Sequence, residues 1–165
     1  MIEGFQPIIG DKPYLMILGS MPSVTSLEKQ EYYGYKHNRF WKIISAYFNQ
    51  EFTSYEEKKS CIKKNHIILW DVIHTCEREG SLDSAIHHEK CNDVEALLAV
   101  HPQIKYVLCN GKKSFHLYEK HFTHLPLQVV CMPSTSNANR SIKEEQLFKE
   151  WFQTFDECYK QMKSK

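Results

Sequence analysis

Short apolar runs alternate with helical patterns along the whole chain. The apolar runs cover residues 14–18, 66–72, 104–109 and 127–132, and each is followed by glycine, proline or a cluster of polar residues. Apolar runs of this length that stop at such turn signals are typical of buried β-strands. Both faces of these segments are apolar, so the pattern predicts central strands of a sheet that is covered on both sides.

The segments between these strands carry apolar residues at helical spacing or capping residues at their starts. Ser54 and Glu57 have the spacing of a capping box, and Asn92 is expected to cap a helix with Glu95 three residues later. The predicted helices cover residues 39–48, 54–64, 92–101, 112–122 and 143–159.

Strands that alternate with helices predict an α/β fold. We expect one domain over residues 1–165, a three-layer α/β/α arrangement around a four-stranded, mainly parallel sheet. Right-handed crossovers bring the carboxyl ends of parallel strands to the same edge. Ligands of open α/β sheets bind at that edge, so we expect the site among the polar loops 19–38, 71–88, 110–113 and 133–140.

Composition narrows the class of protein only a little. The chain has 165 residues, of which 42% are hydrophobic and 25% charged, as in a globular domain. Its formal net charge of +1 neither requires nor excludes a nucleic-acid partner, so any basic patch must be local. Glu3 and Gly4 interrupt any signal-peptide pattern, and no apolar run is long enough to span a membrane. We therefore expect a cytoplasmic protein without membrane contact.

The cysteines and histidines do not form a recognisable metal-binding pattern. None of the six cysteines forms a C-x-x-C pair, and zinc or iron–sulfur sites need closer thiolate spacing. We expect buried, reduced thiols. His74, His87 and His88 have the most metal-like spacing but lack a carboxylate or thiolate to complete a site. The sequence therefore predicts no metal and no other cofactor.

Four sequence blocks lie at the predicted strand ends, in an order typical of one enzyme family. They are GSMPS at 19–23 with YYGYKHNRFW at 32–41, LWDVIHTCEREGSLDSAI at 69–86, CNGKKS at 109–114 and MPSTSNANR at 132–140. With these blocks the chain resembles the uracil-DNA glycosylase superfamily, and most of all its hypoxanthine-DNA (deoxyinosine) glycosylase branch. Each block alone is weak, whereas the four together span most of the chain and are specific.

The resemblance implies a monofunctional DNA glycosylase that acts as a monomer without a cofactor. Such an enzyme flips a deaminated base, here chiefly hypoxanthine, out of DNA and hydrolyses its bond to deoxyribose in base excision repair. The expected partner is DNA that contains deaminated bases. Two alternatives remain open: a uracil- or mismatch-specific glycosylase, and a non-catalytic protein of the same fold that binds damaged DNA or a nucleotide.

The HNRFW segment makes Asn38 the candidate catalytic residue. Sister branches of the superfamily carry Asp or Asn two residues after the first glycine of the GSMPS block, where this chain has Met21. A thioether cannot activate water, so the chemistry shifts to Asn38. Its neutral carboxamide can orient a water molecule but cannot act as an effective base. The alternative is that Asn38 only caps the helix that follows it.

The resemblance assigns base binding to Asp71, Tyr33, Ser20 and Met21. The Asp71 carboxylate could accept the N1–H of hypoxanthine, although it would repel O6. Alternatively, it is a structural acid bonded to His74 or to a loop amide. Tyr33 is expected to stack on the flipped base, unless it only packs the loop or a neighbouring tyrosine takes that place. The backbone N–H groups of Ser20 and Met21 could face the base.

The MPSTSNANR block matches the superfamily's second DNA-contact block. Hydroxyl and amide groups just before a helix N-terminus suit a phosphate, and residues 137–139 would form a small, polar wedge. An Asn- and Ser-rich turn that only caps the following helix is the alternative. The predicted DNA contacts are Ser134, Thr135, Ser136, Asn137 and Arg140.

Overall fold

The computed structural model describes residues 1–164, and its centre is a five-stranded sheet with the strand order β2-β4-β3-β7-β8. Four of these strands are parallel: β3 (Leu15–Gly19), β4 (Ile67–Asp71), β7 (Tyr106–Asn110) and β8 (Gln128–Met132). They confirm the predicted strands, with small shifts at their ends. The fifth strand, β2 (Ile8–Ile9), pairs antiparallel with β4 and corrects the prediction of four strands. Two residues are too few to produce a recognisable sequence pattern.

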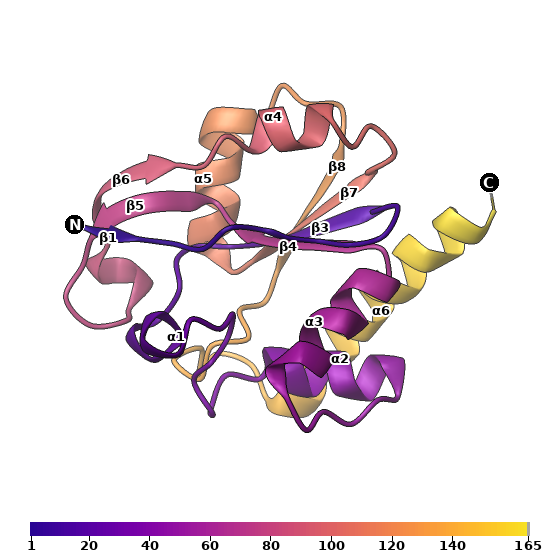
Figure 1. Cartoon of the computed structure of the whole chain (residues 1–165), viewed down its shortest axis with the longest axis horizontal. Coiled ribbons are helices and arrows are strands. Elements are labelled where there is room, and N and C mark those ends of the chain that lie inside the picture. The colour runs from indigo at the N-terminus through magenta and orange to yellow at the C-terminus, as the bar shows by residue number, and fades with distance from the viewer. Residues whose placement is uncertain (165) are drawn as a thin grey trace.

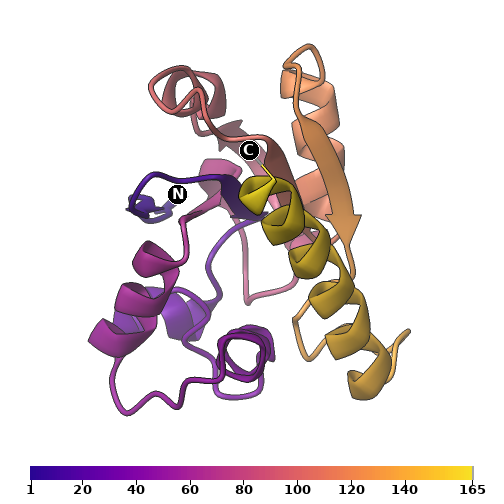
Figure 2. The same cartoon turned by 90° about the vertical axis from the view of Figure 1, so that its right-hand side faces the viewer.

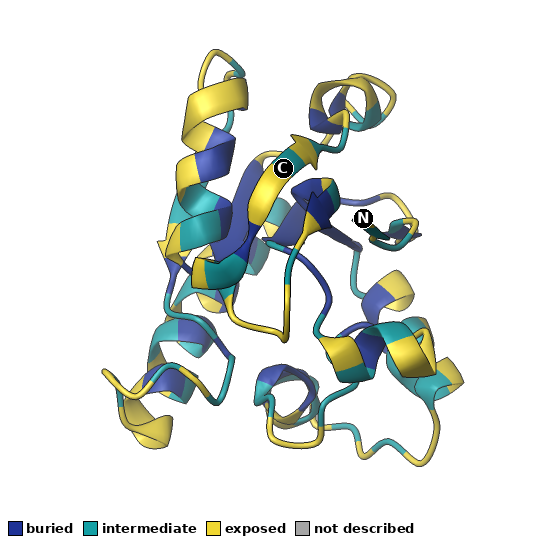
Figure 3. Ribbon diagram, turned by 90° about the vertical axis from the view of Figure 1, so that its left-hand side faces the viewer, coloured by how far each residue is buried: buried dark blue, intermediate teal, exposed yellow. Residues whose placement is uncertain are grey.

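The sheet is apolar on both faces because alternate residues of its strands point to opposite sides. In β3, Leu15 and Ile17 belong to one buried cluster, whereas Met16 and Leu18 belong to another. Helices complete each cluster and lie on opposite sides of the sheet (Figure 1). Burial is concentrated in the strands, and the outward sides of the helices are exposed (Figure 3). The first cluster takes in α2 (Phe40–Phe48), α3 (Tyr55–Lys64) and α6 (Glu144–Lys163), and the second α4 (Val94–Ala99) and α5 (Lys112–Phe122).

A second, smaller sheet includes much of the segment 71–88, which the polar pattern predicts to be a loop. Its order is β1-β5-β6, and both pairs are antiparallel. The sequence of the last strand, HHEKC, has no apolar pattern, so only its backbone pairing with the middle strand defines it. The elements are β1 (Ile2–Glu3), β5 (Ile73–Glu77), the 3₁₀-helix η1 (Asp83–Ala85) and β6 (His87–Cys91).

One helix was not predicted, α4 is shorter than its predicted range 92–101, and the last helix runs past its predicted end. The helix α1 (Val24–Lys29) lies inside the segment 19–38, which the pattern predicts as a loop. It begins where the Ser23 side chain accepts the N–H of Ser26 at 3.1 Å, and it is too short to show a helical period. The last helix, α6, continues to Lys163, past the predicted end at residue 159. It runs from the loop after β8 toward the C-terminus (Figure 2).

The start of α4 and the burial of the thiols correct two smaller predictions. Asp93 rather than Asn92 caps α4, since its side chain accepts the N–H of Ala96 at 3.0 Å. The Asn92 side chain instead donates to the backbone carbonyl of Asp71 at 2.7 Å. All six cysteines are free thiols, but Cys131 is exposed because it lies on the edge strand β8.

Candidate active site

A cleft of about 1040 Å³ opens at the carboxyl edge of the parallel strands, where the strand pattern predicts the site. Its walls come from the segment between β3 and α2, the end of β4, η1, the start of α5 and the loop between β8 and α6. Of the predicted site residues, only Arg140 is absent from its lining. The cleft therefore brings together Ser20, Met21, Tyr33, Asn38, Asp71, Ser134, Thr135, Ser136 and Asn137.

Gly19 is the point where three parts of the site approach one another. It ends β3 and lies opposite Asp71, the last residue of β4. A Cβ at Gly19 would overlap the Asp71 Oδ1 atom and would lie 3.0 Å from the Tyr33 hydroxyl. Only a residue without a side chain therefore lets these two groups meet at the floor of the cleft.

Asp71 is a buried acid with an unsatisfied oxygen. It is 4% exposed, and its Oδ2 atom has no hydrogen-bond partner among the residues that the structure describes. Burial, with a smaller contribution from the charge of Asp83, raises the pKa of Asp71 to about 7, although the charge of Arg78 opposes the shift. No hydrogen bond joins this carboxyl to His74, which is exposed and lies 4.0 Å from Glu3. The carboxyl is therefore divided between its neutral and charged forms near neutral pH.

Tyr33 lies beside this acid in a strained backbone conformation. Its φ of 52° is in the left-handed region, which aromatic residues rarely adopt. Its ring stacks on Phe40 with centroids 4.2 Å apart, and its hydroxyl accepts a hydrogen bond from Asn110 Nδ2 at 3.1 Å. Burial and the nearby Asp71 charge both raise the pKa of Tyr33, so the hydroxyl stays neutral. One face of the ring is thus backed by Phe40.

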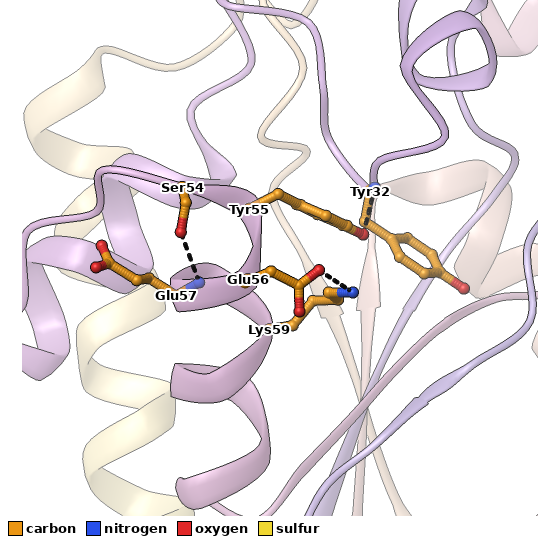
Figure 4. Close-up of polar contacts among 6 residues, drawn as sticks. All are labelled: Tyr32, Ser54, Tyr55, Glu56, Glu57 and Lys59. Atoms are coloured by element: carbon orange, nitrogen blue, oxygen red, sulfur yellow. Dashed lines mark hydrogen bonds and ion pairs between the residues drawn. The ribbon is translucent and has the colours of Figure 1, made fainter.

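The neighbouring Tyr32 anchors the loop to α3 (Figure 4). Its backbone N–H donates to the Tyr55 hydroxyl at 3.0 Å, and its own hydroxyl donates to a backbone carbonyl. Tyr55 is the first residue of α3, which Ser54 caps as predicted by accepting the N–H of Glu57 at 3.2 Å. Tyr32 is therefore used to fix the loop, which leaves Tyr33 beside Asp71.

Asn38 bonds the first residue of α2 and lines the cleft. Its Oδ1 atom accepts the backbone N–H of Phe40 at 2.9 Å and the hydroxyl of Thr135 at 2.9 Å. Arg39 is the N-cap residue of α2 and makes no side-chain capping bond, so Asn38 supports the start of the helix from the position before the cap. This contact does not exclude a role in chemistry, because the side chain belongs to the cleft lining.

Asn110 is a site residue that sequence reasoning missed. It ends β7 and is only 7% exposed. Its Oδ1 atom accepts the backbone N–H of Thr135 at 3.0 Å, and its Nδ2 atom donates to the Thr135 hydroxyl at 3.0 Å. The sequence signal that could have identified Asn110 is its place in the CNGKKS block, directly after a predicted strand. Thr135 is 0% exposed, and its hydroxyl takes part in this network.

The rest of the loop 133–141 uses many of its polar groups to hold its own shape. The Ser134 hydroxyl accepts the N–H of Ser136 at 3.2 Å, and the Ser136 hydroxyl accepts the N–H of Ala138 at 3.2 Å. These bonds agree with the alternative of an Asn- and Ser-rich turn. A hydroxyl that accepts one bond can still donate another, so both serines remain available to an anion. Arg140 is exposed.

Arg39 holds this loop against the start of α2, which the sequence pattern does not reveal. Its guanidinium donates to the backbone carbonyls of Thr135 at 3.3 Å, Ser136 at 2.6 Å and Asn139 at 3.3 Å. Its backbone N–H also donates to the Thr135 carbonyl at 3.0 Å. One side chain thus joins the two walls of the cleft, although they are far apart in the sequence.

The GSMPS block forms the opposite wall. The Ser20 hydroxyl donates to Asp83 Oδ1 at 2.7 Å, and Met21 is 8% exposed. Arg78 donates to the Pro22 carbonyl at 2.6 Å, while its Nε and Nη1 atoms have no partner among residues 1–164. Asp83 and Arg78 are two further residues that sequence reasoning missed. They set the charge around Asp71.

Comparisons with known proteins agree with this arrangement. The family model described as "Uracil DNA glycosylase superfamily" matches residues 7–156. The chain belongs to the uracil DNA glycosylase superfamily. Two curated relatives, from Methanosarcina barkeri and Methanosarcina acetivorans, are each 36% identical over 140 residues and are both named hypoxanthine DNA glycosylase. The match covers 84% of this chain and 88% of each relative.

A solved structure has the same fold. It is the solution NMR structure of a Methanosarcina acetivorans protein described as a candidate uracil DNA glycosylase. It superimposes with a TM-score of 0.83 at 33% identity, over 95% of this chain and 98% of that one. This superfamily member thus keeps the shared architecture over nearly its whole length.

The residues that the structure describes hold no group of three or more His, Cys, Asp or Glu side chains that could bind a metal ion. Among the same residues, no helix is long and apolar enough to cross a membrane. The chemistry that this glycosylase-superfamily cleft offers comes from one buried acid, a network of neutral amides and hydroxyls, and a stacked aromatic pair.

Replacing Arg39 by methionine should loosen the loop 133–141. The change removes the side-chain bonds to three loop carbonyls; those of Thr135 and Ser136 keep a backbone N–H partner, and that of Asn139 loses its donor. We therefore expect a melting temperature several degrees lower and faster hydrogen exchange in residues 134–139. Lys42→Met, which removes an exposed cation from the same helix, is the matched control and should change neither. Equal exchange in both variants would contradict the role of Arg39.

Asp71 should make the protein less stable as the pH rises. The native carboxyl keeps its proton up to about pH 7, whereas an unfolded one has its ordinary value of 3.8. The native state therefore binds more protons between these values, and stability falls as the pH rises through 7. We expect a melting temperature several degrees lower at pH 8 than at pH 5.

Asp71→Asn, which cannot ionise, should lose most of this difference. Asp11→Asn, at an exposed position, serves as the control and should keep it. If Asp71→Asn and wild type show the same pH dependence, the buried carboxyl is not its source.

Proposed function

We propose that this protein is a monofunctional DNA glycosylase that flips deaminated bases out of DNA and hydrolytically excises them, chiefly hypoxanthine. The observation that carries the proposal is that Asn38, Asp71 and Tyr33 line the same cleft. It is supported by the two relatives of 36% identity, which are named hypoxanthine DNA glycosylase. Met21, an apolar side chain, stands in the place of the polar residue of sister branches and argues against strong uracil excision. We further propose that the enzyme works as a monomer in the cytoplasm, without a metal.

The size and walls of the cleft suit a flipped nucleotide. Ligand clefts of about 300–1,000 Å³ hold molecules of drug size, and this one reaches about 1040 Å³. A purine ring that enters it would meet Tyr33, whose ring is already backed by Phe40. Stacking of a base on an aromatic side chain contributes about 1–3 kcal/mol and does not depend on the base, so selectivity must come from polar groups.

Asp71 is the group that we propose reads the base edge. A neutral carboxylic acid has one donor and one acceptor, which match the O6 and N1–H of hypoxanthine. The raised pKa of about 7 makes this neutral form available, and it removes the repulsion of O6 that a carboxylate would cause. The backbone N–H groups of Ser20 and Met21 are proposed to add contacts from the opposite wall.

DNA on either side of the lesion is proposed to lie over the loop 133–141. Ser134, Ser136 and Asn137 line the cleft. Arg140 follows them in the same loop, and its side chain is exposed. Hydroxyls, amides and a guanidinium are the groups that most often bind phosphates, and such contacts position DNA without reading its sequence.

A base-release assay with oligonucleotides that contain deoxyinosine, deoxyuridine or deoxyxanthosine tests the function. We expect hypoxanthine release to be fastest, and Asn38→Ala to slow it about 10²–10³-fold under single-turnover conditions, as when a positioning or hydrogen-bonding group is removed. Its melting temperature should also fall, because the cap on Phe40 is lost at a cost of about 1 kcal/mol.

The outcomes of this assay separate the alternatives. Preferential release of uracil would favour the mismatch-specific activity, and binding without any release would favour a damage-binding protein. If Asn38→Ala melts at a lower temperature but releases the base at the wild-type rate, Asn38 only stabilises the start of α2.

Arg140→Ala should weaken binding to lesion-containing and undamaged duplex alike. Loss of one phosphate contact lowers the slope of log affinity against log salt by about 1. The control is Lys160→Ala, an exposed charge near the far end of α6, which should leave the slope unchanged. Weaker binding to lesion DNA alone would mean that Arg140 contacts the base or its neighbours.

A further inference from the structure

The directions of the hydrogen bonds around Asn38 are all determined by backbone donors. The N–H of Phe40 can only donate, so the side-chain atom that it meets in Asn38 is the oxygen. In the same way, the N–H of Thr135 identifies the oxygen of Asn110. Neither carboxamide can turn over without placing an NH₂ group against an N–H group.

The Thr135 hydroxyl links the two side-chain amides and makes the orientation of Asn38 depend on that of Asn110. It accepts a hydrogen from Asn110 Nδ2 at 3.0 Å, so its own hydrogen is free to point elsewhere. The acceptor in its reach is Asn38 Oδ1, at 2.9 Å. Thr135 is 0% exposed, so water does not compete for this bond.

Asn38 consequently presents a donor to the cleft. An amide oxygen has two lone pairs, and Phe40 and Thr135 occupy both. The Nδ2 atom of Asn38 has no hydrogen-bond partner among the described residues, and Asn38 is part of the cleft lining. Two bonds to the oxygen also polarise the amide, which strengthens its N–H donors.

We propose that Asn38 acts through its NH₂ group as a hydrogen-bond donor to the departing base, and that Thr135 is the positioning residue that holds it in this orientation. This inference rests on the proposed glycosylase function. It differs from water orientation through the amide oxygen, because that oxygen is already occupied on both sides.

The chemistry of base release needs such a donor. When the bond between C1′ and the base nitrogen breaks, its electron pair stays on the base, and charge develops on acceptor atoms such as N3, N7 and O6 of hypoxanthine. Water then forms the new C1′–O bond and loses one proton to solvent, while the released base takes up one. A donor aimed at the base interacts more strongly as its charge grows, so it lowers the barrier more than it strengthens binding.

Asn38→Asp tests the direction of this bond. The carboxylate can keep both bonds at one oxygen, so the cap and the melting temperature should be retained, but its second oxygen is an acceptor where the amide has a donor. We expect hypoxanthine release at least about 10²-fold slower, with DNA affinity reduced far less. Release at or above the wild-type rate would show that an acceptor suffices, and would overturn the proposal.

Thr135→Val and Thr135→Ser test the positioning role. Valine removes the hydroxyl at similar volume, so we expect a single-turnover rate about 10-fold lower with little change in DNA affinity, and serine should restore most of the loss. Equal rates for wild type and Thr135→Val would contradict the positioning role, as would failure of serine to restore the rate at an unchanged melting temperature. If Asn38→Asp melts well below wild type, this pair decides the question.

The wild-type assay distinguishes this inference from the function on which it rests. If wild type releases no deaminated base, the proposed function fails. If wild type releases hypoxanthine and Asn38→Asp does so equally well, only the donor role of Asn38 fails.

Discussion

The close approach of the strand ends at Gly19 is the constraint on which the site depends. The parallel register places Gly19 opposite Asp71, and the missing side chain leaves room for the Asp71 carboxyl and the Tyr33 hydroxyl together. Burial of that acid is possible because apolar residues fill both faces of the sheet behind it. The same packing therefore stabilises the fold and raises the pKa of the group at the cleft floor.

Two polar networks of different character share the cleft. On one side, the buried Asp71 has a pKa of about 7 beside the charged groups of Asp83 and Arg78, so its interaction with a base depends on pH. On the other side, Asn110, Thr135 and Asn38 are neutral, and their hydrogen bonds follow one direction at every pH at which the protein folds. In this arrangement, recognition of the base and stabilisation of its departure would respond separately to pH.

The loop 133–141, where we propose that DNA binds, is held in place by an internal cation. Arg39 donates through its Nε and Nη2 atoms to three backbone carbonyls, and these bonds fix the loop. The loop therefore keeps its shape before any DNA arrives, which reduces the entropy that binding would cost. A chain with a net charge of only +1 needs such local order, because long-range attraction to DNA is weak.

Apolar runs and turn residues determined four strands, most helices and the edge at which the cleft opens, since these depend on local periodicity. The strand β6, the two-residue strand β2 and the short helix α1 were decided by pairing or capping, which leaves no periodic signal. The four motif blocks placed Asn38 and Asp71 at the cleft, but they could not show that Asp71 is buried and has a raised pKa. Nor could they show which end of the Asn38 amide faces the substrate. Both depend on groups distant in sequence, Asp83 and Thr135 among them, that only the packed structure brings within hydrogen-bond or Coulomb range.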